Sequence, residues 1–315
     1  MIHTASPQIE LRGLHRVFEE THAVNDVSFE VYAGEVFGYI GPNGAGKTTS
    51  MRILATLDEP TSGDAFVDGF SVVEDPDRVR RRLGFMPDYF GTYQNVNVLE
   101  YLDFFARAYG LMGRERINAI GEVMEFTQLD ELAYKPIDGL SKGMKQRLCL
   151  GRTMIHNPSV LILDEPAAGL DPRARIELRD MITRLAAAGK AILISSHILT
   201  ELAEMSDRVA IIERGRILAV GSVAEISAGV QTSSTVRVRA LFDHDRLLGW
   251  LKHHEDIADV QIDGEHFVFS HAGNAESEAA LLKAMVEAGF AVVEFGARHK
   301  SLEDVFLHVT KGQVQ

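Results

Sequence analysis

The chain has 315 residues, of which 46% are hydrophobic, and this length and composition suggest about two folded domains. Its net charge of −13 argues against broad nucleic-acid binding, which requires a basic surface, and its single cysteine excludes an internal disulfide. The longest apolar runs, residues 160–163 and 191–194, are far shorter than the roughly 20 residues of a membrane helix. We therefore expect any membrane pore to belong to another chain.

Short strands are predicted on both sides of a glycine-rich loop in the first half of the chain. Their patterns cover residues 9–11, 27–31, 36–40, 63–69 and 83–86. The third strand runs directly into the loop, and a helix is expected to start near Lys47. From residue 98 to about 132 the apolar residues follow a helical spacing, which predicts a helical insert at about residues 93–140.

Strands alternate with helices further along the chain. The expected strands are 160–163, 191–194 and 209–212, and the expected helices are 173–188 and 199–206. This alternation predicts an α/β fold with a mostly parallel sheet that is covered on both faces. A polar stretch at residues 228–235 is typical of a linker, so the predicted domains are 1–228 and 229–315.

The second predicted domain is small and of the α+β class. Its strands are expected at 236–241, 258–262, 266–269 and 291–295, and its helices at 245–254 and 276–288. The order β-α-β-β-α-β is that of a ferredoxin-like unit. A last helix is expected from Ser301, its predicted N-cap.

The glycine-rich loop fits the pattern G-x-x-x-x-G-K-[ST], which binds phosphate. It reads Gly41-Pro42-Asn43-Gly44-Ala45-Gly46-Lys47-Thr48. Glycines allow backbone N–H groups to surround phosphate oxygens, while Lys47 would reach the β- and γ-phosphates and Thr48 would bind Mg²⁺. An ordinary glycine-rich turn is the alternative.

Two carboxylates follow the apolar strand at 160–163. Asp164 is expected to reach the magnesium ion, and Glu165 to orient and activate the attacking water. An acidic pair at the start of a helix, before Pro166, is the alternative. His197, at the end of the next apolar strand, is expected to contact the γ-phosphate, although a histidine in such a place is often only structural.

Further elements occur in a fixed order. They are Leu140-Ser141-Lys142-Gly143-Met144, Gly169-Leu170-Asp171 and Ser195-Ser196-His197. Together with the phosphate loop and the acidic pair, they give residues 9–221 a resemblance to the ATP-binding subunits of ABC transporters. The resemblance implies the ABC ATPase variant of the P-loop NTPase fold, in which antiparallel N-terminal strands and the helical insert accompany the parallel sheet.

In the family that the chain resembles, two copies enclose ATP. Ser141 and Gly143 of one copy would contact the γ-phosphate on the phosphate loop of the other, and Asp171 would lie on a loop that crosses the dimer. Phe18 matches the aromatic residue that stacks on adenine, with an ordinary core aromatic as the alternative. The resemblance implies ATP and Mg²⁺ as ligands, with these assignments: catalytic, Lys47, Glu165 and His197; nucleotide-binding, Phe18, Val24, Gly41, Pro42, Asn43, Gly44, Ala45, Gly46, Lys47, Thr48, Thr49, Ser141, Gly143 and Asp171; metal-binding, Thr48, Asp88 and Asp164.

Two positions depart from the family pattern. Asp88 stands where glutamine usually provides an oxygen to magnesium and senses the membrane subunit, so metal binding could survive while coupling is in doubt; a plain surface aspartate is the alternative. Met144 stands where the signature usually has glutamine. Because the phosphate contacts are expected from Ser141 and Gly143, we expect this change to leave the chemistry intact.

The implied function is ATP hydrolysis that drives a separate membrane permease. The C-terminal extension and the phrase Gly84-Phe85-Met86-Pro87-Asp88 resemble ATP-binding subunits of ABC-2-type exporters, whose cargoes include drugs, lipids and polysaccharides. The expected partners are a second copy, or a paralogous ATPase subunit, and the permease, with no nucleic acid. The expected place is the cytoplasmic face of the cell membrane. A soluble ABC-type ATPase that remodels a macromolecular complex is the alternative.

Overall fold

The computed structural model describes residues 6–89, 91, 95–222, 224–226 and 234–298. The chain divides into two units, Met1–Ser222 and Val223–Gln315, which are described here one at a time. The sequence predicts this division slightly later, after residue 228. Most of the predicted linker lies outside the described residues, but its last two residues, Ser234 and Thr235, belong to a strand.

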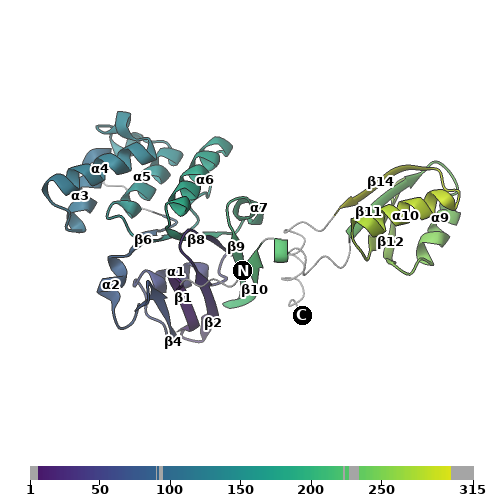
Figure 1. Ribbon diagram of the computed structural model, residues 1–315, viewed down its shortest axis with the longest axis horizontal. Coiled ribbons are helices and arrows are strands. Elements are labelled where there is room, and N and C mark those ends of the chain that lie inside the picture. Colours follow the sequence, from purple (N-terminus) through teal and green to yellow (C-terminus); the bar gives the residue numbers. More distant parts are fainter. Residues whose placement is uncertain (1–5, 90, 92–94, 223, 227–233, 299–315) are drawn as a thin grey trace. The chain divides into compact units, whose positions relative to one another are not determined.

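A six-stranded sheet forms the centre of the first unit (Figure 1). Its strands are β3 (Val36–Ile40), β6 (Leu83–Met86), β7 (Val160–Leu163), β8 (Ala191–Ser196), β9 (Arg208–Glu213) and β10 (Arg216–Ser222), in the order β10-β9-β3-β8-β7-β6. Neighbouring strands run parallel except for β9 and β10. Every residue of β3, β7 and β8 is buried, as expected for strands that are covered on both faces. The predicted mostly parallel sheet is present, and β10 extends it beyond the predicted strands.

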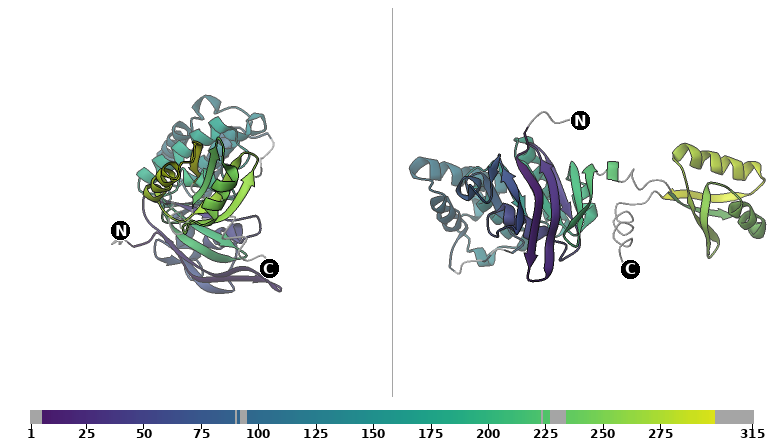
Figure 2. Two further views of the ribbon diagram at one scale, coloured as in Figure 1. Left: turned by 90° about the vertical axis from the view of Figure 1, so that its right-hand side faces the viewer. Right: turned by 90° about the horizontal axis from the view of Figure 1, so that it is seen from below.

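A second, antiparallel sheet comes mainly from the N-terminal part of the chain. Its strands are β1 (Ile9–Phe18), β2 (Thr21–Val31), β4 (Ser62–Val67) and β5 (Phe70–Ser71), in the order β2-β1-β4-β5. Figure 2 shows β1 and β2 as two long purple strands side by side, and their register shifts three times between Leu11 and Val17. Such bulges interrupt the alternation of apolar and polar residues. The strands predicted at 9–11 and 27–31 therefore cover only one end of this hairpin.

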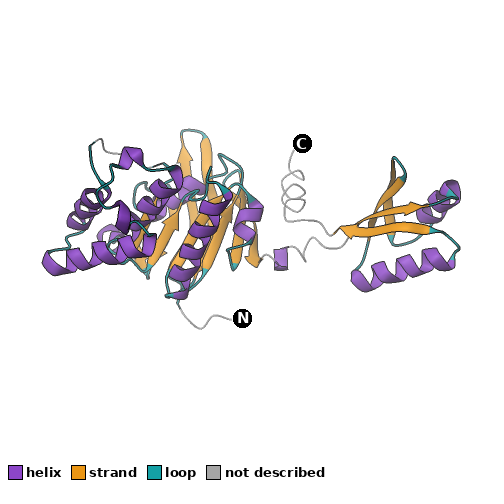
Figure 3. Cartoon of the chain, turned by 90° about the horizontal axis from the view of Figure 1, so that it is seen from above, coloured by secondary structure: helices purple, strands orange, loops and turns teal. Residues whose placement is uncertain are grey.

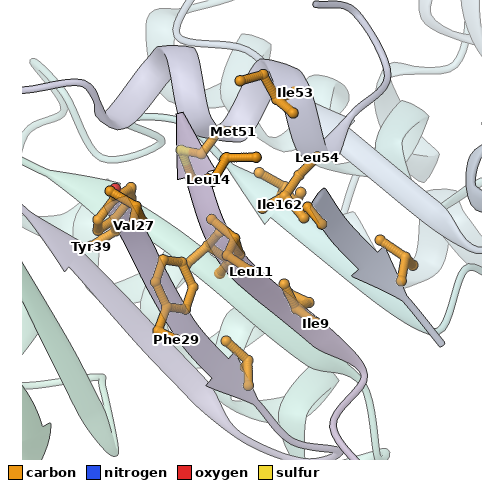
Figure 4. Close-up of a cluster of buried hydrophobic side chains, with 14 of the residues drawn as sticks. Ile9, Leu11, Leu14, Val27, Phe29, Tyr39, Met51, Ile53, Leu54 and Ile162 are labelled. Atoms are coloured by element: carbon orange, nitrogen blue, oxygen red, sulfur yellow. The ribbon is translucent and has the colours of Figure 1, made fainter. Parts of the chain in front are cut away.

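The main apolar core lies between the two sheets and helix α1 (Lys47–Leu54). In Figure 4, Leu14 of β1, Val27 of β2 and Met51 of α1 belong to this cluster, and all three side chains are fully buried. Ile162 joins the cluster from β7, the strand that precedes the acidic pair. The core therefore fixes the phosphate loop and the acidic pair on one framework.

Helices cover the strands of the parallel sheet, as the purple ribbons of Figure 3 show. They include α5 (Lys142–Met154), α6 (Pro172–Ala187) and α7 (Leu199–Ala203), which pack against its strands, and α2 (Pro76–Arg80), which packs beside β5 and β6. Among the described residues, no helix combines the length and the hydrophobicity needed to cross a membrane.

The helical insert consists of α3 (Val98–Ala108), α4 (Gly113–Thr127) and two short 3₁₀ helices, η1 (Asp130–Leu132) and η2 (Ile137–Gly139). A capping box starts α3, because Asn97 accepts from the Glu100 N–H while the Glu100 side chain accepts from the Asn97 N–H. Figure 1 shows α3 and α4 beside α5, and the three helices share a second apolar cluster. The insert therefore packs directly on the helix that follows the predicted signature.

The C-terminal unit has the predicted order β-α-β-β-α-β. Its elements are β11 (Ser234–Ala240), α9 (His244–Lys252), β12 (Ile257–Asp263), β13 (His266–His271), α10 (Ala275–Glu287) and β14 (Val292–Arg298), and the strand order is β12-β13-β11-β14, antiparallel throughout. Apolar residues of both helices pack against alternate residues of β11 and β13, so both helices cover the same face. The last predicted helix, from Ser301, lies outside the described residues.

Candidate functional site

The phosphate loop connects the end of β3 to the start of α1, as predicted. Its backbone leaves no room for side chains at two positions: a Cβ at Gly41 would collide with the Ile212 carbonyl oxygen, and one at Gly46 with the Ala23 carbonyl oxygen. Gly46 also has a φ of 106°, which L residues rarely adopt. Helix α1 begins at the next residue, so the free N–H groups of its first turn face the loop. This geometry suits an anion.

Lys47 extends back over the loop. The residue is 5% exposed, and Nζ donates to the carbonyl oxygens of Gly41 (2.6 Å) and Pro42 (3.3 Å). Nζ also lies 3.6 Å from Oε1 of Glu165. Burial lowers the pKa of Lys47, and the nearby carboxylates of Glu165 and Asp164 oppose this shift. Lys47 therefore connects the loop to the acidic pair.

Asp164 is almost completely buried at the end of β7. It is 1% exposed, and Oδ1 accepts a hydrogen bond from Oγ of Ser195 (2.6 Å), while the Thr48 side chain also bonds to the carboxylate. Burial raises the pKa of Asp164, and these two hydrogen bonds lower it. The charges of Asp88 and Glu165 raise it further.

The second oxygen of Asp164 provides a test for a metal ligand. Within the described part of the chain, Oδ2 is buried and has no hydrogen-bond partner. A buried carboxylate oxygen without a partner is costly unless a cation or a proton meets it. With the Thr48 hydroxyl beside it, this carboxylate offers the hard oxygen donors that Mg²⁺ prefers, so the residues fit that ion.

Glu165 lies between Lys47 and His197. Its Oε2 is 2.8 Å from Nδ1 of His197, which is 45% exposed, and its own N–H donates to Oγ of Ser195 (2.9 Å). The φ of Glu165 is 49°, a strained value for a non-glycine residue, and such strain often occurs at functional sites. The structure thus brings Lys47, Asp164, Glu165 and His197 together, as the sequence predicts.

Ser195 has a contact role that the motifs did not reveal. Its hydroxyl donates to Asp164 and accepts from the Glu165 N–H, so a single buried side chain fixes both members of the acidic pair. Gln146 is a second such residue, because its buried Nε2 donates to the Pro166 carbonyl oxygen (2.9 Å) just after Glu165. The sequence signal for Ser195 is weak: a small hydroxyl residue at the end of an apolar strand.

Two residues of β2 and its neighbour β1 that the sequence predicts to bind nucleotide, Phe18 and Val24, differ in exposure. Phe18 is 42% exposed, and the guanidinium of Arg16 lies 4.4 Å from the centre of its ring, so Phe18 is not a core aromatic. Val24 has no exposed surface and belongs to the main apolar core. The structure therefore does not bring the Val24 side chain to a surface that a nucleotide could contact, contrary to the sequence prediction.

The signature serine and Asp171 both cap helices of their own chain. Ser141 is the N-cap of α5, where Oγ accepts from the Met144 N–H (3.3 Å), and Asp171 is the N-cap of α6, where Oδ1 accepts from the Ala174 N–H (2.9 Å). A Cβ at Gly143 would lie 3.1 Å from that of Ala174, so the two helix starts are close. The four residues Lys47, Asp164, Glu165 and His197 are called the Lys47 cluster below. Across the described residues, no hydrogen bond or ion pair joins Ser141 or Asp171 to this cluster.

The two departures from the family pattern have different surroundings. Asp88 is exposed just after β6, yet its charge raises the pKa of Asp164, so it acts electrostatically on the acidic pair. Met144 is partly buried and packs against the apolar cluster of the helical insert. Its side chain therefore contributes to packing within the chain.

A parallel sheet with a phosphate loop at its centre and a carboxylate pair beside it defines a nucleotide-hydrolysing protein of the P-loop class. A family model described as ABC transporter matches residues 24–168. An uncharacterized ABC transporter ATP-binding protein, YxlF, of Bacillus subtilis (strain 168) is 35% identical over 301 residues, which cover 96% of this chain and 99% of the relative. Nod factor export ATP-binding protein I of Burkholderia lata is 34% identical over 310 residues, which cover 98% of each chain.

A solved structure of an ATP-binding subunit of an ABC transporter superposes with a TM-score of 0.65 and 30% identity, covering 71% of this chain and 93% of that subunit. It confirms the predicted P-loop ATPase fold. The chain belongs to the ATP-binding proteins of ABC transporters. It is accordingly an ATPase subunit that binds nucleotide.

Proposed function

We propose that two copies of this chain hydrolyse ATP between them and so drive a separate membrane permease that exports its cargo. The observation that carries this proposal is the arrangement around Glu165. One oxygen of its carboxylate lies 3.6 Å from the Lys47 ammonium, and the other lies 2.8 Å from Nδ1 of His197. A carboxylate held between a phosphate-binding cation and an imidazole is suited to act on a water beside the γ-phosphate.

The roles follow from the chemistry of the three side chains. Phosphate oxygens would replace the carbonyl contacts of Lys47, because an ammonium binds charged oxygens more strongly than carbonyl oxygens. Glu165 would orient the attacking water and accept its proton. His197 would keep Glu165 in position through its ring nitrogen and contact the γ-phosphate from the other side.

Mg²⁺ would be held by Thr48, Asp164 and Asp88. Three observations support this set: Oδ2 of Asp164 has no hydrogen-bond partner among the described residues, the Thr48 hydroxyl bonds to the same carboxylate, and the charge of Asp88 acts on Asp164. When bound, the ion supplies positive charge to the phosphate oxygens. The backbone of residues 41–46 and the side chain of Thr49 would surround the remaining phosphate charge.

The second copy would complete each site. The exposed Ser141 and the backbone of Gly143 lie at the start of α5, where free N–H groups favour an anion. Because neither contacts the Lys47 cluster within the described part of one chain, their use on ATP requires another copy. The exposed ring of Phe18 would stack on adenine.

The permease would dock where the core meets the helical insert. A groove at this place combines apolar, aromatic and basic side chains, and among its lining residues are Leu57, Phe85, Pro87, Phe105, Tyr109 and Arg152. Asp88 and Tyr89 follow the lining residue Pro87 in the sequence, and Phe104 precedes the lining residue Phe105. Tyr89 is 79% exposed and Phe104 is 57% exposed. Large exposed aromatics beside a groove are typical of a protein interface. The chain would thus be peripheral on the inner face of the cell membrane.

Export is supported by relatives that match both units of the chain. The Burkholderia protein is named for the export of Nod factor, and the match covers 98% of each chain. Nod factor is the cargo in the name of that relative, and we do not propose it as the cargo of this chain. We propose only the class of exporters, with the cargo contacts in the permease.

Two variants test the catalytic proposal. Glu165→Gln should bind ATP but lower kcat by about a hundredfold or more, because it removes the base and leaves the volume unchanged. Glu204→Gln, an exposed carboxylate on the same unit, is the control and should hydrolyse ATP normally. Near-normal turnover by Glu165→Gln would refute the assigned role.

A pull-down of the Glu165→Gln protein from its native membranes with Mg-ATP tests the transporter proposal. A polytopic membrane protein among the captured partners is the expected result. Lys47→Ala, which should not bind ATP, is the control and should lose any partner that depends on the ATP-bound form. Capture of ribosomal or only soluble partners would favour a remodelling ATPase instead.

A further inference from the structure

Arg175 connects two functional segments of the first unit. It lies in the first turn of α6, where its Nε donates to the Leu170 carbonyl oxygen (3.1 Å). Its Nη1 lies 2.7 Å from Oε1 of Glu201 in α7. One guanidinium therefore joins the loop before Asp171 to the helix that follows His197.

The two segments that Arg175 contacts both lead to Glu165. The loop from Glu165 to Asp171 begins at the proposed base and ends at the residue expected to meet the second copy. Helix α7 begins two residues after His197, which contacts the same base. Arg175 thus connects the end of the loop near Asp171, through Glu201 and α7, to His197 and so back to Glu165.

The surroundings favour a specific role for this ion pair. The Glu201 side chain is only 12% exposed whereas that of Arg175 is 40% exposed, so water reaches the ion pair mainly from the arginine side. Helix α6 and the segment of α7 with its C-cap Glu204 also flank a pocket, which is lined by two ion pairs, Arg175–Glu201 and Arg179–Glu204. Charged bridges across a pocket can hold the helices at a defined separation without continuous apolar packing.

We propose that Arg175 is a positioning residue that transmits the position of the Asp171 loop to His197 and Glu165. The proposal rests on the proposed function, in which the second copy meets this loop. When the second copy fixes the loop, the Leu170 carbonyl and Arg175 fix α7, and the imidazole is held against the base. Arg175 itself does not touch the reacting atoms.

Arginine is required because the two contacts use different nitrogens of one plane. Nε reaches the carbonyl while Nη1 reaches the carboxylate. A lysine ammonium at this position could keep the ion pair with Glu201, but its single nitrogen cannot match both positions with the same fixed geometry. Arg175→Lys should therefore keep the positive charge near Glu201 but lose the simultaneous contact with the Leu170 carbonyl oxygen.

The neighbouring ion pair provides a matched control. Arg179 lies one turn further along α6, and its Nη1 is 2.6 Å from Oε2 of Glu204. This pair joins the same part of the unit but has no hydrogen bond to the Asp171 loop in the described structure. Arg179→Ala removes the same kind of bridge without the proposed connection.

The experiment compares steady-state ATP hydrolysis by the full-length chain and its variants. Arg175→Ala should lower kcat by about tenfold to a hundredfold with little change in KM for ATP, since a small misplacement of a catalytic group has effects of this size. Arg175→Lys should recover only part of kcat, and Arg179→Ala should remain within about twofold of wild type. In the Glu165→Gln background, Arg175→Ala should still form ATP-dependent dimers.

Equal effects of Arg175→Ala and Arg179→Ala on kcat would overturn the proposal, as would an effect on KM alone. Thermal unfolding identifies a folding defect, and in that case Glu201→Gln, which keeps the size of the side chain, replaces Arg175→Ala with the same expected loss of kcat. Normal turnover by Glu165→Gln would instead refute the proposed function. Loss of turnover in Glu165→Gln together with normal kcat in Arg175→Ala would refute this inference alone.

Discussion

Ser195→Ala should lower both the free energy of unfolding and the Mg²⁺ affinity of the site, although no sequence motif assigns Ser195 a role. The hydroxyl is fully buried, donates to Oδ1 of Asp164 at 2.6 Å and accepts from the Glu165 N–H at 2.9 Å. Alanine removes both bonds and leaves a buried carboxylate oxygen and a backbone N–H without this partner. The change is small in volume, so lost hydrogen bonding should dominate over lost packing.

The magnitude follows from the two bonds. A hydrogen bond to a charged group contributes about 1.5–3 kcal/mol, and one between neutral groups about 1 kcal/mol. Because the two share one hydroxyl, we expect a total loss of about 2–4 kcal/mol of unfolding free energy. The pKa of Asp164 should also rise further, since Ser195 is one of the two bonds that lower it.

The pH dependence has a definite sign. A carboxylate whose pKa is raised by folding stabilises the fold below its ordinary pKa, and this contribution is lost as pH rises through the raised value. A further rise in the pKa of Asp164 makes the loss in Ser195→Ala larger at neutral pH than in acid. Protons and Mg²⁺ compete for this carboxylate, so the variant should need more Mg²⁺ for half-maximal ATP hydrolysis, increasingly so as pH falls from neutral.

Urea unfolding at neutral and acidic pH and Mg²⁺ titrations of ATP hydrolysis measure these effects. Ser196→Ala is the matched control, because the Ser196 hydroxyl accepts from the Ile198 N–H (3.0 Å) and has no bond to Asp164. It should lose about 1 kcal/mol and keep the Mg²⁺ dependence of the wild type. An unchanged Mg²⁺ requirement in Ser195→Ala would refute the reasoning.

Three further variants test other parts of the site and the fold. Burial lowers the pKa of His156 to about 4 from an ordinary 6.5, so the protein should lose up to about 3 kcal/mol as pH falls from 6.5 toward 4, and His156→Gln should flatten this loss in urea unfolding. Phe18→Ala should raise KM for ATP by about tenfold, whereas Phe18→Tyr should keep it near wild type; equal KM values would exclude stacking. Asp88→Asn should raise the Mg²⁺ concentration for half-maximal hydrolysis if Asp88 binds the ion beside Asp164, and an unchanged titration would leave it a surface aspartate.

The sequence predicts the parts of the site that depend on local backbone. A glycine loop between a strand and a helix, and two carboxylates after an apolar strand, each place their side chains through neighbouring residues alone. The parallel arrangement of β3, β7 and β8 then brings the strand ends to one edge of the sheet. For this reason Lys47, Asp164, Glu165 and His197 could be predicted to meet.

Contacts between distant residues could not be predicted in the same way. The bond from Ser195 to Asp164 joins residues 31 positions apart, and its atoms meet only because β8 pairs with β7 in one register. The bridge from Arg175 to Glu201 likewise depends on how α6 and α7 lie. Val24 shows the opposite error: its place after a matched aromatic suggested a ligand contact, but the pleat of β2 directs its side chain into the core.

The two helix caps lead us to expect different tasks for Ser141 and Asp171 in the proposed dimer. Ser141 accepts from the Met144 N–H through a long bond of 3.3 Å, and its hydroxyl proton remains free to donate to a phosphate oxygen without loss of the cap. Asp171 is an acceptor only when ionised, and its Oδ1 already accepts from the Ala174 N–H. A carboxylate beside the γ-phosphate would add repulsion, so Asp171 is better suited to a donor group of the second copy than to the nucleotide. We therefore expect Ser141 to contact ATP, and Asp171 to contact a donor group of the second copy.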